Sequence, residues 1–232
     1  MFKRKRNIYL DYAAATPVDR TVAQLMSRVQ KNGFANASAL YTPARERERL
    51  LHEARVSIAD VLGAQEDTIF FTSGGTESCN TAILGVARAY EAKQKTTGHI
   101  ITTHIEHHAV LEPIAFLEKH GWRVTRIAPD EQGIISARDV AKALSIDTAL
   151  VSVMTVNNEV GSIQPIADIG RELLKFRKAQ PSASVVFHTD ACQAMLTVDM
   201  RVDALHVDLL SCNGSKIYGP KGIGVLCKRR GC

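Results

Sequence analysis

The stretch "TIFFTSGGTESCNTAILGVARAYEAK", residues 68–93, indicates a strand, a glycine turn and a helix in immediate succession. Its first five residues are apolar or β-branched, which is typical of a short buried strand. Gly74 and Gly75 end that run, and residues 77–93 then carry apolar side chains at helical spacing. A strand that leads directly into a helix is the repeating unit of α/β folds.

The same alternation continues along the rest of the chain. A further helical pattern covers residues 166–179, and no internal repeat or low-complexity tract is visible. Alternation of this kind predicts an α/β fold with a mainly parallel sheet and helices on both faces. Including the first, the predicted strands are residues 68–72, 99–103, 122–127, 149–154, 184–189, 207–211 and 224–228.

Composition favours one large core and excludes several classes of protein. The chain has 232 residues, of which 45% are hydrophobic, and no apolar run approaches the ~20 residues of a membrane span. The start, "MFKRKRNIYLDY", lacks an apolar signal core, and five cysteines without a CxxC pair suit a reducing compartment. We therefore expect a cytoplasmic protein with no membrane partner.

The net charge of +5 is modest, and the basic residues cluster only at Lys3 to Arg6. A solvated terminus explains this cluster more simply than a nucleic-acid arm, because no interleaved aromatic residues or known binding module accompany it. We expect no nucleic-acid partner.

Chemistry-bearing residues follow five predicted strands at their carboxyl ends, where ligands bind in open α/β sheets. The loops offer a glycine turn at a helix start, an imidazole, an amide pair, a carboxylate beside an amide, and an amine. A cofactor with a phosphate, an aromatic ring, a ring nitrogen and an aldehyde would use all five. The loops read "SGGTES", "HIEHHAV", "TVNNEVG", "DACQA" and "CNGSK".

Each group also has a plain alternative. Gly75 and Thr76 could cradle a phosphate at a helix N-terminus or simply form a helix cap. His107 could stack on a planar ring and move protons, or be bonded locally at a helix start. Asp190 could pair with a protonated ring nitrogen or cap the next helix. Lys216 could be a nucleophilic amine or one lysine among many.

A metal site is not expected. His104, Glu106 and His108 lie close in sequence, and "HIE" resembles the first half of the zinc-deaminase signature. The second half, P-C-x-x-C, is absent, as is H-E-x-x-H.

Taken together, the motifs resemble the cysteine desulfurase family, within the class-V aminotransferase-like enzymes that use pyridoxal 5'-phosphate. The resemblance runs from Tyr9 to about Arg230 with the motifs in family order. It rests on "YLDYAAATPVD", "IFFTSGGTESCNTAILG", "IEHHAVL", "VSVMTVNNEVGSIQPI", "FHTDACQA" and "SKIYGPKGIGVL".

The resemblance implies a role for each candidate residue. Lys216 would bind pyridoxal phosphate covalently and shuttle a substrate proton, and His107 would stack on the cofactor ring and assist proton transfer. Asp190 would bond the ring nitrogen and Gln193 the ring hydroxyl. The other cofactor contacts would be Gly75, Thr76, Asn158, Asn213 and Ser215.

The implied reaction converts L-cysteine to L-alanine and transfers sulfur to an enzyme cysteine as a persulfide. The implied partners are L-cysteine, a second copy of the chain in a homodimer, and a sulfur acceptor or iron–sulfur scaffold protein. The sulfur would serve iron–sulfur cluster assembly or tRNA thiolation.

The sequence also departs from the family. Asn213 and Ser215 replace the serine and histidine of the usual S-x-H-K, and "ANASALYTPA" (35–44) replaces a "GNPSS…H…G" loop. The family's persulfide cysteine belongs to a later part of the sequence. We expect residues 1–232 to form the cofactor-binding large domain, with an N-terminal arm and strand in 1–20 and no small C-terminal domain. Alternatives are another lyase or transferase of the class, or a non-catalytic remnant or dimerising partner that binds the cofactor weakly or not at all.

Overall fold

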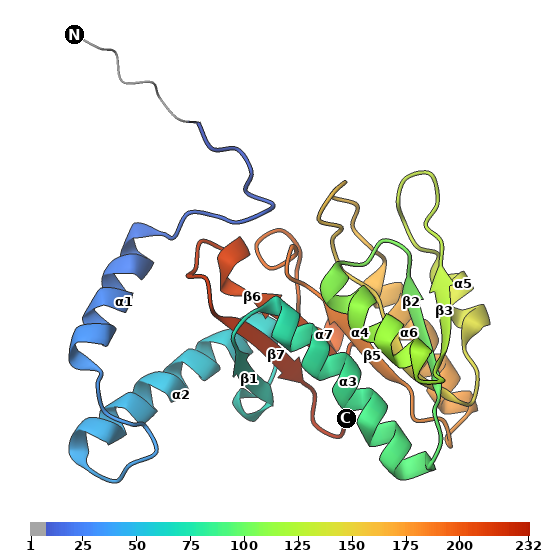
Figure 1. Cartoon of the computed structure of the whole chain (residues 1–232), viewed down its shortest axis with the longest axis horizontal. Coiled ribbons are helices and arrows are strands. Elements are labelled where there is room, and N and C mark those ends of the chain that lie inside the picture. Colours follow the sequence, from blue (N-terminus) through green and yellow to red (C-terminus); the bar gives the residue numbers. More distant parts are fainter. Residues whose placement is uncertain (1–7) are drawn as a thin grey trace.

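The computed structural model describes residues 8–232, so the basic cluster at Lys3 to Arg6 lies outside the described residues. All seven predicted strands are present, each within two residues of its expected ends, in one sheet of order β1-β7-β6-β5-β4-β2-β3 (Figure 1). The strands are β1 (Ile69–Thr72), β2 (His99–Thr103), β3 (Arg123–Ile127), β4 (Thr148–Ser152), β5 (Val186–Asp190), β6 (Leu209–Asn213) and β7 (Gly224–Lys228).

The sheet is mainly parallel, as predicted, and β7 is the exception. β3, β2, β4, β5 and β6 run parallel, whereas β7 is antiparallel to both β6 and β1. Residues 214–223 join β6 to β7, which is too short for the crossover that a parallel neighbour requires. This reversal keeps the β6–β7 connection at the edge where the parallel strands end.

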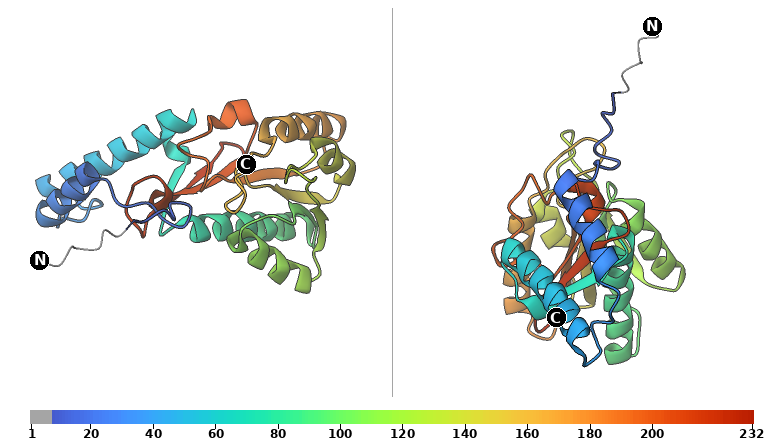
Figure 2. Two further views of the ribbon diagram at one scale, coloured as in Figure 1. Left: turned by 90° about the horizontal axis from the view of Figure 1, so that it is seen from above. Right: turned by 90° about the vertical axis from the view of Figure 1, so that its left-hand side faces the viewer.

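Helices cover both faces of the sheet, also as predicted (Figure 2). One face carries α3 and α4, and the other carries α5, α6 and α7, with the end of α2 beside them. The helices are α1 (Arg20–Asn32), α2 (Thr42–Leu62), α3 (Gly75–Gln94), α4 (His108–Lys119), α5 (Ala137–Ala143), α6 (Ile166–Ala179) and α7 (Val202–Leu205), with single 3-10 turns η1 (Glu66–Thr68) and η2 (Gly214–Lys216).

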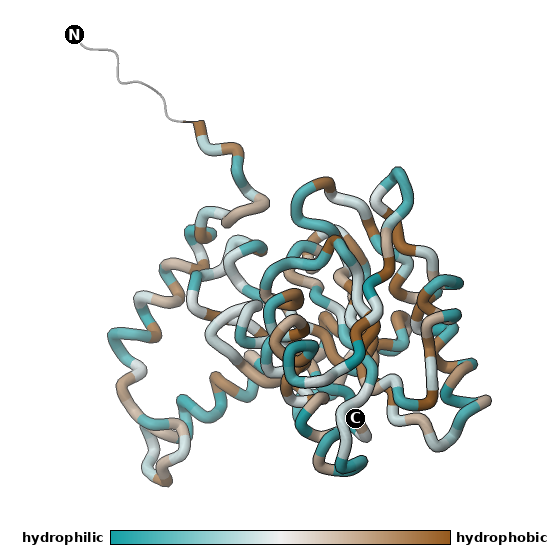
Figure 3. Tube along the Cα trace, turned by 45° about the vertical axis from the view of Figure 1, so that its right-hand side comes forward, coloured by the Kyte–Doolittle hydropathy of each residue, from teal (hydrophilic) through white to brown (hydrophobic). Residues whose placement is uncertain are grey.

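Neighbouring residues of each central strand point to opposite faces, so the sheet separates two apolar cores. On β2, Ile100 packs with α3 and α4, while Ile101 packs with the layer of α5 and α6. Phe187 of β5 is fully buried in that second core. Figure 3 shows the apolar segments gathered inside the body and polar ones outside. Burial on both faces explains the nearly continuous apolar runs of these strands.

The N-terminal arm returns to the sheet through backbone hydrogen bonds. Thr16 N–H donates to Ser215 O (2.8 Å) and Asp19 N–H to Tyr218 O (2.9 Å). Residues 8–19 contain a turn and no strand, which differs from the strand expected in 1–20 for the part that is described. Backbone bonding to the β6–β7 connection brings the arm beside Lys216.

A buried histidine links three strands beneath the carboxyl end of β5. His188 Nδ1 lies 2.9 Å from Ser152 Oγ of β4, and Nε2 lies 3.0 Å from Ser211 Oγ of β6. Burial lowers the pKa of His188 to about 4 from its ordinary 6.5. The folded state therefore favours the neutral ring.

We expect His188→Gln to remove part of the acid sensitivity of folding. Between pH 6.5 and about 4 the unfolded chain binds a proton that folded His188 does not, so this contribution to stability is complete above pH 6.5 and is lost as the pH falls to 4. The free energy of unfolding of the wild type should drop relative to the variant by about 3 kcal/mol across that window. Urea titrations at pH 7 and pH 4.5 measure the difference, and parallel pH curves would contradict the assignment.

Candidate functional site

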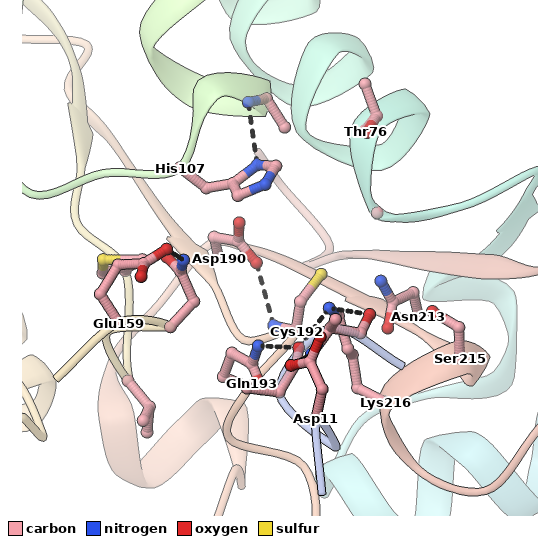
Figure 4. Close-up of a pocket in the computed structure, with 17 residues that line it drawn as sticks. Asp11, Thr76, His107, Glu159, Asp190, Cys192, Gln193, Asn213, Ser215 and Lys216 are labelled. Carbon is pink, nitrogen blue, oxygen red and sulfur yellow. Dashed lines mark hydrogen bonds between the residues drawn. The ribbon is translucent and has the colours of Figure 1, made fainter. Parts of the chain in front are cut away.

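A cavity of about 560 Å³ lies at the carboxyl ends of the parallel strands, where the sequence places its candidate residues (Figure 4). All nine predicted cofactor-site residues line it, so the fold brings together groups that are up to 141 positions apart, from Gly75 to Lys216. The nine are Gly75, Thr76, His107, Asn158, Asp190, Gln193, Asn213, Ser215 and Lys216.

Lys216 ends the turn η2 that follows β6, and its amine contacts the N-terminal arm. Its Nζ donates to Ala13 O (2.6 Å) and Ala14 O (2.7 Å). Both acceptors are backbone carbonyls, so these two bonds place the amine against the N-terminal arm. The arm thus positions the candidate nucleophile from 203 residues away in sequence, a contact that no pattern around Lys216 indicates.

Asp190 is the last residue of β5 and is buried, with 6% of its surface exposed. Its Oδ1 accepts a hydrogen bond from Cys192 N (2.9 Å), and residues 192–197 form turns rather than a helix. The alternative of a helix cap is therefore wrong. Gln193 follows in the same turn and donates from Nε2 to Ala13 O (2.8 Å).

His107 precedes α4 as its N-cap, so the locally bonded alternative does describe one of its nitrogens. Nδ1 accepts from Ala109 N (3.0 Å), which puts the proton of the neutral ring on Nε2. The ring is exposed and borders the cavity on the α4 side, across from Lys216 in Figure 4. The cap thus sets the tautomer and leaves an N–H for a ligand.

The N-terminus of α3 forms another wall. Gly74 is the N-cap and Gly75 the first residue, as predicted, and the first N–H groups of a helix have no acceptor within it. A Cβ on Gly75 would lie 2.5 Å from Cys192 Sγ, so a side chain would collide with the cavity floor. A Cβ on Gly224 would lie 2.5 Å from Gly74 C. Close backbone approach thus holds the glycine turn at the start of α3 in place.

Asn213 and Ser215 flank the same wall where β6 ends. Asn213 Nδ2 lies 3.2 Å from the position of a Gly75 Cβ, and its Oδ1 is buried without a hydrogen-bond partner among the described residues. Asn158 also lines the cavity and donates from Nδ2 to Glu159 Oε1 (2.7 Å). A buried amide oxygen accepts hydrogen bonds, so its missing partner would be a donor from a ligand or from water, while Nδ2 is the donor that could meet an anion.

Cys192 lines the cavity, and Cys79 and Cys212 are buried within the influence of Asp190; none of the three thiols has the character of a nucleophile. Burial, and next the negative charge of Asp190, raise the pKa of Cys79 and Cys192 well above 9 and that of Cys212 to about 12. A reactive cysteine needs the opposite shift because the thiolate is the nucleophile.

Eight residues that were not predicted as site residues also line the cavity. They come mainly from the arm and from the segment after β4, both inside motifs that carry the family resemblance, so the motifs were the available signal. They are Asp11, Ala13, Ala14, Ala109, Met154, Val156, Glu159 and Cys192. Across residues 8–232, no cluster of three or more acidic, histidine or cysteine side chains is arranged for a metal ion, and no helix has the length and apolarity to cross a bilayer.

The donor set fits a planar ligand that carries a phosphate and an aldehyde. Helix N–H groups and the Asn213 amide suit the phosphate, and the His107 ring and Cys192 border the space for a flat ring. Asp190 suits a protonated ring nitrogen, and Lys216 an aldehyde carbon.

Comparisons with known proteins agree with this fit. The family model described as Aminotransferase class-V matches residues 8–232. The chain is 48% identical over 227 residues to Cysteine desulfurase IscS of Dictyoglomus turgidum, covering 98% of this chain and 55% of that protein. It is also 48% identical to Putative cysteine desulfurase IscS 1 of Bacillus subtilis, covering 94% and 55%. The chain therefore spans about half the length of the curated relatives it matches.

Solved structures resemble the fold closely. "SspA in complex with cysteine" has a TM-score of 0.89 at 42% identity, with 96% of this chain and 61% of that chain covered. A structure titled "NIFS-LIKE PROTEIN" has a TM-score of 0.91 at 35% identity, with 98% and 60% covered.

Proposed function

Because this chain belongs to the class-V aminotransferase family, whose enzymes depend on pyridoxal phosphate, we propose that it is the cofactor-binding part of a cysteine desulfurase. The observation that carries the proposal is the convergence of all nine candidate residues on one cavity. Residues 1–232 form one domain in this proposal, because one sheet and its two helical layers include every described strand.

Residues from several walls of the cavity contact the cofactor in this proposal. Gly75, Thr76, Asn213 and Ser215 bind the phosphate, and His107 stacks on the ring. Bound pyridoxal phosphate supplies an electron sink for the charge that remains when the substrate α-carbon loses a proton.

The protein's own groups then orient the substrate and move protons. Lys216 would hold the cofactor through its aldehyde carbon, and its Nζ would take the α-proton of the substrate. His107 donates from Nε2, the nitrogen that its helix-cap bond leaves free. Asp190 keeps the ring nitrogen protonated, and Gln193 and Asn158 orient the ring hydroxyl and the substrate.

Sulfur transfer requires a thiolate that attacks the sulfur of L-cysteine. The C–S bond breaks, the thiolate gains the sulfur as a persulfide, and the remaining carbon takes a proton to give L-alanine. Cys79, Cys192 and Cys212 do not serve this step, since their raised pKa values keep them as thiols. Burial raises the pKa of Cys227 as well. The attacking group would be the family's persulfide cysteine, whose motif none of the five cysteines of this chain matches.

The persulfide would pass its sulfur to an acceptor or scaffold protein for iron–sulfur cluster assembly or tRNA thiolation. We place the protein in the cytoplasm, since all five cysteines are free thiols.

A homodimer is supported by apolar side chains exposed on and after α1, namely Leu25, Val29, Phe34 and Leu40. A strictly monomeric sedimentation profile would contradict the dimer.

The proposal predicts selective binding of the phosphorylated cofactor. We expect pyridoxal phosphate to give a visible absorbance band with the chain, and pyridoxal, which lacks the phosphate, to bind at least about tenfold more weakly because charge-assisted hydrogen bonds are lost. Adding L-cysteine should change the band. L-alanine has the same amine without sulfur, so a change that both amino acids produce reports the amine and not sulfur transfer. Equal binding of the two aldehydes would contradict the phosphate cradle, and no band with either would favour the non-catalytic remnant.

A further inference from the structure

A buried carboxyl group stands directly behind the proposed cofactor site and has no part in the functions described so far. Glu106 lies between β2 and α4, immediately before His107, and has 6% of its surface exposed. Its neighbours in sequence, His104 and His108, are exposed, so the three residues do not form a cluster.

One oxygen of this carboxyl group joins two walls of the cavity. Glu106 Oε1 accepts from Thr103 Oγ1 (2.7 Å), at the end of β2, and from Met154 N (2.9 Å), just after β4. Met154 itself lines the cavity, and His107 follows Glu106 in the chain. The carboxyl group thus ties the loop that carries the ring-stacking histidine to the loop that carries Asn158.

A neighbouring bond strengthens the same link. Asn157 Nδ2 donates to Ile105 O (3.0 Å), so the residues before His107 and the residues before Asn158 are joined twice. Asn157 is 6% exposed, as buried as Glu106. Both links are inside the protein, where an unmade hydrogen bond is costly.

The surroundings of the other oxygen of Glu106, Oε2, favour the uncharged form of the carboxyl group. Oε2 is buried and has no donor among the described residues. The ionisable groups that act on it from neighbouring elements are Asp190 of β5 and Cys79 of α3, and no cation contributes. Desolvation in the first place, with a smaller effect from Asp190, raises the pKa of Glu106 to about 8.

We propose that Glu106 is a positioning residue that acts as a neutral carboxylic acid: it clamps the His107 loop to the Met154 loop and leaves Asp190 as the carboxylate of the cavity floor. This inference rests on the proposed function, because the clamp matters for binding only if the cavity holds pyridoxal phosphate. The protonation of Glu106 can be tested on the chain alone, without cofactor.

The neutral state has a thermodynamic signature of known sign. The folded-state pKa lies above the unfolded value of about 4.5, so between pH 4.5 and 8 the folded protein holds a proton that the unfolded chain has lost. This contribution to stability is complete below pH 4.5 and declines as the pH rises through 8. Glutamine copies the neutral acid, accepts the same two hydrogen bonds and does not titrate.

The first experiment compares unfolding of cofactor-free wild type and Glu106→Gln by urea between pH 5 and pH 9. We expect the unfolding midpoint of wild type to fall relative to the variant as the pH rises to about 8. Glu112→Gln is the matched control, since Glu112 is an exposed glutamate in α4, and it should follow the wild type. Parallel curves for wild type and Glu106→Gln would overturn the proposal.

The second measurement tests the clamp through binding of pyridoxal phosphate at pH 7. Glu106→Gln should bind within about threefold of wild type, whereas Glu106→Leu should bind about tenfold or more weakly because Thr103 and Met154 lose their buried acceptor. A Gln variant as weak as the Leu variant would overturn the neutral state. If the wild type binds no cofactor, the proposed function fails, but the unfolding curves still test the protonation of Glu106. If Glu106→Leu does not fold, the comparison of wild type with Glu106→Gln decides.

Discussion

Lys216→Ala is expected to abolish the visible absorbance band that pyridoxal phosphate gives with the wild-type chain. The lysine amine is the group in the cavity suited to bond an aldehyde carbon, and it lies at the end of η2 against the arm carbonyls of Ala13 and Ala14. Alanine removes the amine while leaving the turn backbone intact. Absorbance during titration with pyridoxal phosphate measures the effect.

A second substitution separates charge from nucleophilicity. Lys216→Arg keeps a cation that can bond the same two carbonyls, but a guanidinium stays protonated and does not attack an aldehyde. It should also lack the band. Lys221 is an exposed lysine of the same connection, and Lys221→Ala should keep the band. If the band disappears in Lys221→Ala, or persists in Lys216→Ala, the cofactor binds elsewhere.

Asp190→Asn is expected to weaken binding of pyridoxal phosphate by roughly 30-fold or more. Truncating one partner of a buried charge pair costs about 2–5 kcal/mol, and Asp190 is the buried carboxylate that lines the cavity. Asparagine has the same shape and can still accept from Cys192 N through Oδ1, so the turn after β5 is preserved. Fluorescence or absorbance titration gives the affinity.

Two comparisons make this result specific. Asp199→Asn changes an exposed carboxylate on the same connection between β5 and α7 and should bind the cofactor as wild type does. The thermal midpoint of cofactor-free Asp190→Asn should lie close to or above that of wild type, because a buried charge has been removed. Unchanged affinity in Asp190→Asn would show that the carboxylate does not face the ring nitrogen.

Much of the fold was predictable because both faces of the central strands are buried. Burial on two sides produces apolar runs such as "SVVFHT", and the helix over 166–179 was predicted with its exact ends from its apolar periodicity. The direction of β7 was not predicted, since strand patterns carry no sign of parallel or antiparallel pairing. The length of the connection over 214–223 decides it.

In the candidate site too, some residues could be predicted from the sequence and others could not. Residues just after the strands were predictable, because carboxyl ends of parallel strands meet at one edge. The contacts of Ala13 and Ala14 with Lys216 were not, because they depend on how the arm returns through its backbone hydrogen bonds. No local pattern contains a contact across 200 residues.

The sequence by itself thus determined the α/β architecture, the family and the set of chemistry-bearing loops, since each follows from short-range periodicity or from residues within one motif. Only the tertiary structure decided which nitrogen of His107 is free, that Asp190 begins a turn instead of capping a helix, and that Glu106 is buried behind the site. The burial of Glu106 depends on solvent exclusion and on its bond to Met154, 48 residues away, and desolvation arises only when distant segments pack together. The bonds of His107 and Asp190 span two residues each, and only the folded backbone fixes their geometry.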